Sequence, residues 1–215
     1  MYNYVGGVSL LLGILFTFFS LLKWGVNSVS NGTPSRITPY NQAFSIWTPI
    51  FGLSIYKSIY AITSYTQDEN DTTLVLLCIS YVACAFWVYY SSYKYYKYAL
   101  FFIISACILA IYAHMLEKRP QQLPDWISQS AGAMLGSWLS IASLIYLDYT
   151  LSTIVFDPIV PLFMATFIGA ISIYFEKPLL MISIIWASFY LRKYSLLALF
   201  VSFGLGSISI YNFTI

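Results

Sequence analysis

The chain has 215 residues, of which 60% are hydrophobic and only 8% are charged, and its net charge is +2 at pH 7. A soluble domain carries about 25% charged residues, so this chain cannot cover a water-facing surface. The small net charge also excludes the basic footprint of a nucleic-acid-binding protein. Because lipid offers backbone groups no hydrogen-bond partners, the long apolar runs predict an all-α polytopic membrane protein.

Five apolar segments fill the first two thirds of the chain, and short polar loops separate them. No basic region precedes the first segment, so we expect a membrane helix there and not a signal peptide. The fourth segment stops at a charged run and two Pro residues, which end helices. The expected helices cover residues 5–22, 44–64, 74–91, 101–116 and 127–147.

Three further apolar segments follow, at residues 154–175, 178–191 and 194–211. The second of them is shorter than the ~20 residues of a typical span, so it would be tilted or re-entrant. We therefore predict eight spans, with seven as the alternative. The bundle would occupy residues 1–150, and residues 151–215 would add helices to the same membrane domain.

The second segment opens with an aromatic turn that contains Phe44, Trp47 and Phe51. Pro49 leaves a helical carbonyl without its usual donor, so we expect the helix to bend there. A bend beside these rings would open a lined recess between helices. The alternative is a turn that enters the membrane, with Trp47 as an interfacial anchor.

Aromatic residues make up 20% of the chain, beyond what two interface belts need. Trp47, Trp87 and Trp138 fall in three different helices, and Tyr90 shares a helical face with Trp87. These rings either pack a plain core or wall a flat apolar slot for a planar ligand, since ligand sites are concave and sparingly polar.

Few residues could carry catalytic chemistry. His114 precedes Glu117 by three residues, so one helical face holds both, as a helix-end polar pair or as a proton or ligand contact. Lys57 lies within the second helix, where it either snorkels to the headgroups or borders the recess and meets an acidic ligand group. No metal-ligand spacing occurs, and the three Cys residues are expected to be small buried hydrophobes.

Small residues recur every four positions in the fifth segment, at Gly132, Gly136 and Ser140. Such a stripe lets two helix backbones approach closely in lipid. We expect it to pack against another helix, in the same chain or in a second copy of the chain. In the second case the protein would be a homodimer.

The distribution of Lys and Arg predicts the orientation of the chain. With eight spans, one face collects Lys23, Arg36, Lys94, Lys97, Arg192 and Lys193. The other face collects Lys118, Arg119, Lys177 and an acidic loop. The first face is expected to be cytoplasmic, which places both termini on the non-cytoplasmic side.

Residues 43–51, with the sequence Ala-Phe-Ser-Ile-Trp-Thr-Pro-Ile-Phe, resemble the signature of the tryptophan-rich sensory protein / translocator protein (TspO) family, in its larger multi-span branch. Weaker echoes follow in the expected order at residues 85–87 and 136–142. The family often carries Asn one or two turns from these Trp residues, whereas here the neighbourhoods hold Cys84 and Tyr146. The ligand contacts are therefore expected to differ.

The resemblance implies a five-helix bundle over residues 5–149 that binds porphyrins and related hydrophobic molecules between its helices. It favours a non-enzymatic receptor, carrier or sensor for a planar ligand of tetrapyrrole, sterol or carotenoid type. A bound porphyrin, haem or other pigment and membrane lipid would be its partners. The alternatives are a secondary transporter of a small solute and, less favoured because no acid/base set is evident, an enzyme acting on a lipid or pigment.

Overall fold

A computed structural model describes residues 4–24, 45–63, 71–150, 159–189, 204–208 and 210. Within these ranges every regular element is a helix, which confirms the all-α prediction. The helices are α1 (Tyr4–Trp24), α3 (Trp47–Thr63), α4 (Asp71–Ser92), α5 (Tyr96–Leu116), α6 (Leu123–Thr150), α7 (Ile159–Tyr174), the short 3-10 helix η2 (Pro178–Leu180) and α8 (Met181–Phe189).

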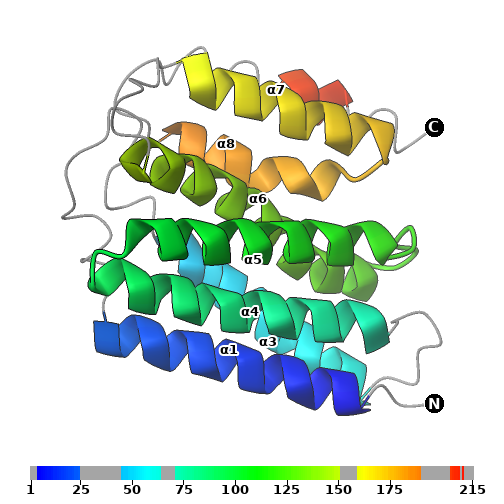
Figure 1. The fold of residues 1–215 in the computed structure, drawn as a ribbon. Coiled ribbons are helices and arrows are strands. Elements are labelled where there is room, and N and C mark those ends of the chain that lie inside the picture. Colours follow the sequence, from blue (N-terminus) through cyan, green and yellow to red (C-terminus); the bar gives the residue numbers. More distant parts are fainter. Residues whose placement is uncertain are drawn as a thin grey trace.

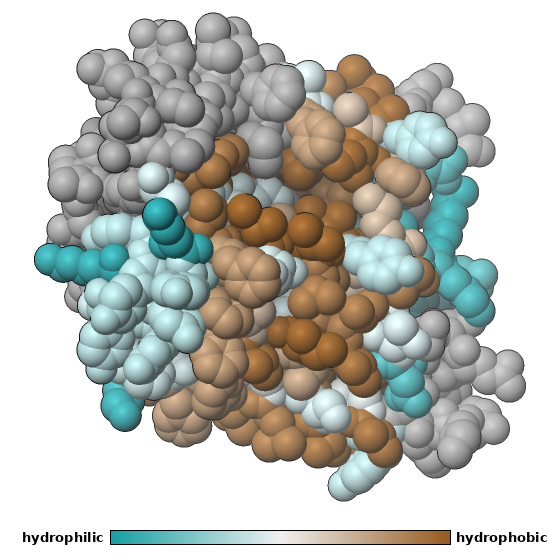
Figure 2. Space-filling model, viewed as in Figure 1, coloured by the Kyte–Doolittle hydropathy of each residue, from teal (hydrophilic) through white to brown (hydrophobic). Residues whose placement is uncertain are grey.

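An apolar belt crosses the middle of the face shown in Figure 2, and hydrophilic residues lie on both sides of the belt. Among the described helices, α1, α4 and α5 are long and apolar enough to cross a membrane. Apolar side chains such as Leu12, Phe19 and Phe101 remain more than 60% exposed on them, as lipid-facing residues would. The chain is thus a helical membrane protein, and its number of spans stays a prediction.

The helices form two layers. Figure 1 shows α1, α4 and α5 side by side, with α3 and α6 crossing behind them and with α7 and α8 continuing the bundle beyond α6. The most extensive backbone contacts join α1 to α4, α4 to α5, and α5 to α6, while α3 lies against α1 and α6. Most of the buried apolar side chains form one cluster among these five helices.

Glycines allow several close helix contacts, of which two illustrate the packing of α1 on α4 and of α6 on α5. A Cβ atom on Gly13 of α1 would lie 3.0 Å from the carbonyl oxygen of Cys78 on α4. A Cβ atom on Gly136 of α6 would lie 2.8 Å from Cγ1 and 3.1 Å from the backbone nitrogen of Ile111 on α5. Close backbone approach of this kind is how helices pack in lipid, where no hydrophobic force drives them together.

Two helices end in the same left-handed cap. Lys94 after α4 has φ 61°, and Glu176 after α7 has φ 54°. In each cap the left-handed residue donates to the carbonyl three residues back, and the next residue donates to the carbonyl five residues back. This is the Schellman arrangement, in which glycine is the usual left-handed residue.

Some sequence-predicted details are wrong. Residues 45–46 form a 3-10 turn and α3 begins at Trp47, so Pro49 lies in the first helical turn and not in the interior. A proline there removes an N–H that has no intrahelical acceptor anyway, and the predicted bend has no cause. The helix predicted to end at 147 continues to Thr150.

The C-terminal third fits the expectation in part. The predicted segment 154–175 contains α7, and 178–191 contains η2 and α8. Of the segment 194–211, the described residues 204–208 are helical and the others, apart from residue 210, lie outside the described part of the chain.

Candidate functional site

Five aromatic side chains, which we call the aromatic cluster, meet where α3, α4 and α6 face one another. The ring centroids of Trp47 and Phe51 are 5.5 Å apart, and those of Trp47 and Trp87 are 6.3 Å apart at an interplanar angle of 23°. Phe51 stacks on Tyr81 at 6.0 Å, and Trp87 meets Tyr146 edge-on at 5.6 Å. These separations are typical of offset-stacked and edge-to-face pairs.

Helical spacing brings these rings together. Trp47 and Phe51 are four residues apart on α3, and Trp87 and Ser91 are four apart on α4, so each pair shares a helix face. Ser91 and Tyr146 share a hydrogen bond between their hydroxyls. The Tyr81 hydroxyl likewise bonds the Ser54 hydroxyl at 2.6 Å, one turn beyond Phe51. The phenol groups are therefore satisfied in the core.

The two indole groups differ from the phenols. Trp47 and Trp87 are 5% and 1% exposed, and neither Nε1–H has a hydrogen-bond partner. A buried donor without a partner costs about 1–3 kcal/mol. The buried core therefore holds two unsatisfied indole donors, one on α3 and one on α4, whose rings stack on each other. A ligand acceptor would be favoured beside them.

The rings fill a space that the backbones leave open. Among the described helices, neither α3 with α4 nor α4 with α6 has extensive backbone contact. A flat molecule between two parallel rings needs about 7 Å between their planes, twice a normal carbon contact. Because the Trp47 and Trp87 centroids are only 6.3 Å apart, a ligand would have to separate or replace these contacts.

The other predicted wall residues are placed differently. Trp138 is fully buried in the same apolar core. Tyr90 stacks instead on Phe102 of α5, with centroids 5.4 Å apart and planes within 8°. Phe44 lies outside the described residues.

A second group, which we call the ionic cluster, consists of Lys57, His114, Glu117 and Ser128. The Lys57 ammonium donates to Glu117 Oε1 at 2.8 Å and to Ser128 Oγ at 3.1 Å. His114 Nδ1 lies 2.6 Å from Glu117 Oε2. The side chains of Lys57 and His114 are 1% exposed and that of Glu117 is 6% exposed, so this is a buried ion pair.

Glu117 connects the ionic cluster to the C-terminal helices as well. Lys177, in the turn between α7 and η2, donates its ammonium hydrogen to the backbone carbonyl of Glu117. Burial alone would raise the pKa of the Glu117 carboxyl, but Lys57 and His114 outweigh it and hold this pKa below its ordinary value of 4.5. Burial lowers the pKa of Lys177, partly offset by the Glu117 charge. The carboxylate of Glu117 is therefore ionised at neutral pH.

The sequence indicated only part of this cluster. It predicted a shared face for His114 and Glu117, and it singled out Lys57. It missed Ser128, whose small hydroxyl has no distinguishing spacing. For Lys57 it offered two alternatives, snorkelling to the headgroups or bordering the recess, whereas the structure places the ammonium in a buried contact with Glu117 and Ser128. His114 Nε2 is buried and has no hydrogen-bond partner.

The small-residue stripe of α6 faces α5 and α4 of the same chain. Gly136 touches Ile111, and a Cβ atom on Gly132 would lie 3.5 Å from Leu77 Cδ2 and 3.6 Å from His114 Cβ. The Ser140 hydroxyl lies 3.2 Å from the sulfur of Cys107. The stripe thus has partners within one chain.

The comparisons with known proteins give one match. A family model described as TSPO-like protein matches residues 6–191. No curated protein and no solved structure matches the chain. Within the described residues, no group of three or more His, Cys, Asp or Glu side chains is placed to hold a metal ion.

Proposed function

The chain belongs to the TSPO-like family, as the motif at residues 43–51 predicted, and on this basis we propose that it binds a planar hydrophobic ligand in the aromatic cluster. Family membership supports a membrane ligand-binding or sensor-type protein in general. The finer proposal is a non-enzymatic receptor, carrier or sensor whose ligand is inserted between α3, α4 and α6.

The observation that carries this proposal is the pair of buried indole donors on Trp47 and Trp87. Plain core packing would explain stacked rings, but it gives no reason to leave two N–H groups unsatisfied on adjacent helices. A ligand that offers an acceptor between the rings would remove this cost and keep the stacking.

The donors also narrow the proposed ligand class. A tetrapyrrole with carbonyl or carboxylate groups, or a sterol with a hydroxyl, offers an acceptor to an indole N–H. A pure hydrocarbon carotenoid offers none, so it would leave both donors unpaired. The aromatic walls contribute about 0.5–1.5 kcal/mol per stacked pair beyond area burial.

The proposed topology is multi-pass. Lys23, Lys94 and Lys97 lie at one end of the bundle, which we call the basic end, where α1 finishes and α4 turns into α5. The opposite end carries Lys118 and Arg119. We propose that the basic end faces the cytoplasm and that both termini lie on the other side.

Tryptophan quenching tests the ligand proposal. The purified protein is titrated with protoporphyrin, haem and a sterol, and each titration is repeated with Trp47→Leu. We expect saturable quenching by at least one ligand in the wild type and an affinity about threefold to tenfold lower in the variant.

Trp126→Leu is the matched control, because it removes an indole from the start of α6 at the opposite end of the bundle. It should bind like the wild type. Weak, non-saturating quenching that is the same in wild type and Trp47→Leu would contradict the ligand proposal. Trp47 would then be a residue that only packs the core.

The ionic cluster favours a second candidate, a proton-coupled secondary transporter. Transporters need ionisable residues inside the membrane domain, and these often form proton relays. His114, with one nitrogen on Glu117 and the other unpartnered, has the chemistry of such a relay. Proteoliposomes under a pH gradient test it: solute uptake that Glu117→Gln abolishes would favour transport, and absence of gradient-driven uptake would remove this candidate.

A further inference from the structure

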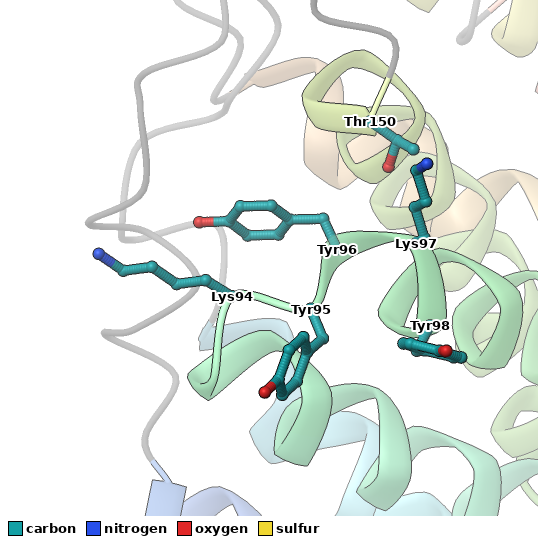
Figure 3. Close-up of a pocket in the computed structure, with 6 residues that line it drawn as sticks. All are labelled: Lys94, Tyr95, Tyr96, Lys97, Tyr98 and Thr150. Atoms are coloured by element: carbon teal, nitrogen blue, oxygen red, sulfur yellow. The ribbon is translucent and has the colours of Figure 1, made fainter.

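A pocket opens at the basic end of the bundle, away from the ionic cluster and next to Tyr146 of the aromatic cluster. It has a volume of about 330 Å³ and is lined by Lys94, Tyr95, Tyr96, Lys97, Tyr98 and Thr150. Figure 3 shows Lys97 and Thr150 pointing toward one another across its edge, while Lys94 and Tyr96 extend along the other side. We call this feature the basic pocket; the described residues of its lining include two ammonium groups and no carboxylate.

The local fold concentrates positive potential in the basic pocket. The left-handed cap at Lys94 reverses the chain within three residues. Helix α5 therefore begins at Tyr96, between Lys94 and Lys97. This 21-residue helix has no side-chain N-cap and no acidic residue in its first turn. The N-terminal dipole of α5 therefore adds to the charges of Lys94 and Lys97, and no acidic residue in the first turn of α5 offsets it.

The rest of the lining is amphipathic. Tyr95 and Tyr98 are 57% and 61% exposed, and they lie at the start of α5, a helix long and apolar enough to cross a membrane. Tyrosine settles at the end of such a helix because its ring prefers the acyl boundary and its hydroxyl prefers the headgroups. The Thr150 hydroxyl already donates to the Tyr146 carbonyl at 2.7 Å, which leaves its oxygen as an acceptor.

From these observations we infer that the basic pocket binds the headgroup of an anionic phospholipid, with the phosphate on Lys94 and Lys97 and the glycerol and upper acyl chain along Tyr95 and Tyr98. Basic pockets between membrane helices at the cytoplasmic side are suited to such headgroups. A free phosphate shares the charge chemistry but makes no use of the exposed rings. The inference does not depend on the ligand proposed for the aromatic cluster.

The test is lipid retention measured by native mass spectrometry. The full chain is exchanged into detergent micelles doped with phosphatidylglycerol or with phosphatidylcholine, and bound lipid is counted across a concentration series. Three proteins are compared: wild type, Lys94→Gln/Lys97→Gln, and Lys118→Gln/Arg119→Gln. The last removes two exposed charges from the opposite end and so matches the change in net charge.

We expect phosphatidylglycerol to bind the wild type more tightly than phosphatidylcholine, and the Lys94/Lys97 variant to lose about tenfold in affinity for it. The Lys118/Arg119 variant should bind like the wild type. Equal loss in both variants would show a non-specific charge effect and overturn the inference. Displacement of the lipid by millimolar inorganic phosphate would also overturn it, in favour of a free-anion site.

Thermal melting of the three proteins in lipid-free detergent separates folding from binding. Because Lys94 and Lys97 are exposed, their replacement should leave the melting temperature unchanged. A variant that melts like the wild type and still retains phosphatidylglycerol equally well would contradict the inference.

Discussion

One helix contributes to two clusters of opposite character. Trp47 and Phe51, near the start of α3, join the aromatic cluster, and Lys57, ten residues after Trp47 and about 15 Å along the axis, joins the ionic cluster. In the aromatic cluster the contacts are ring stacks with adjustable geometry, and two indole donors are unsatisfied. In the ionic cluster the Lys57 ammonium and both Glu117 oxygens are held at 3.1 Å or less.

The difference between ring stacking and ion pairing indicates which part of the bundle can rearrange to admit a ligand. Stacked rings lose little energy when they slide, because each atom contact is small. A buried ion pair loses much when one partner leaves, because the other charge stays uncompensated in a medium of low dielectric. We therefore expect the ionic end to fix the helices and the aromatic end to make room for a ligand.

Removing one charge from the ionic cluster should have the largest effect. Lys57→Met leaves Glu117 buried without its main counter-ion, and we expect a loss of about 3–5 kcal/mol in the free energy of unfolding. Denaturant titration in a mild detergent measures it. Lys118→Met, an exposed charge next to Glu117, is the control and should be nearly neutral. If the two variants lose the same stability, the ionic cluster does not hold the bundle together.

Helix α6 also contributes to both clusters, through Ser128 and Tyr146, and it offers the next test. Gly136 lies on α6 between Ser128 and Tyr146, and a larger side chain would strike Ile111. Gly136→Leu should cost about 1–3 kcal/mol and should weaken both clusters, because α6 must move away from α5. Gly52→Leu is the control, since nothing lies within 4 Å of a Cβ atom there. Unchanged melting of Gly136→Leu would show that α6 is not in close contact with α5.

A smaller and more selective effect should follow from acid. The pKa of Glu117 is lower in the folded protein than its ordinary value of 4.5. Its contribution to stability is therefore complete above about pH 4.5 and is lost as the pH falls through the folded value. Melting temperatures between pH 3 and pH 7 should fall at the acid end, and Glu117→Gln should flatten that fall. An unaltered acid profile in Glu117→Gln would assign the effect to other groups.

The smallest expected effect concerns Glu176, in the turn that also holds Lys177. This turn supports the ionic cluster, because Lys177 donates to the Glu117 carbonyl. Glu176 has φ 54°, a conformation that glycine adopts without the cost of about 1 kcal/mol that other residues bear. Glu176→Gly should stabilise the protein by about this amount. Glu176→Ala removes the same charge but keeps the backbone cost, so it should be neutral. Equal melting of the two variants would remove the backbone explanation.

Much of the helical pattern could be predicted from the sequence. Apolar runs bounded by charged or Pro-containing loops predict α1, α4 and α5 to within a few residues at most ends. The start of α5 is less well predicted, because the aromatic run 93–98 resembles an interfacial turn while only residues 93–95 form it. The cause given for a bend at Pro49 is absent, because α3 begins at Trp47 and a proline in the first turn removes no intrahelical hydrogen bond.

The pairing between helices could not be predicted in the same way. Lys57 and Glu117 are 60 residues apart in the sequence. No local pattern predicts that α3 contacts the end of α5, or that Lys57 also bonds Ser128 of α6. The sequence placed Trp47, Trp87 and Trp138 in separate helices, and the structure places all three in one buried core. Whether these rings contact a ligand stays a prediction, because a closed stack is compatible with both roles.

The contact between α1 and α4 has a consequence for biosynthesis. α1 is made early but packs most extensively on α4, which the ribosome completes only after α3. Until then its hydroxyls can rely on bonds within α1, from Thr17 to the Gly13 carbonyl and from Ser20 to the Phe16 carbonyl. Only when α4 arrives can the single Thr17 hydroxyl hydrogen be shared with the Tyr81 carbonyl. Helix α1 can therefore wait in the lipid or beside an insertase, with these two hydroxyls satisfied, until α4 emerges.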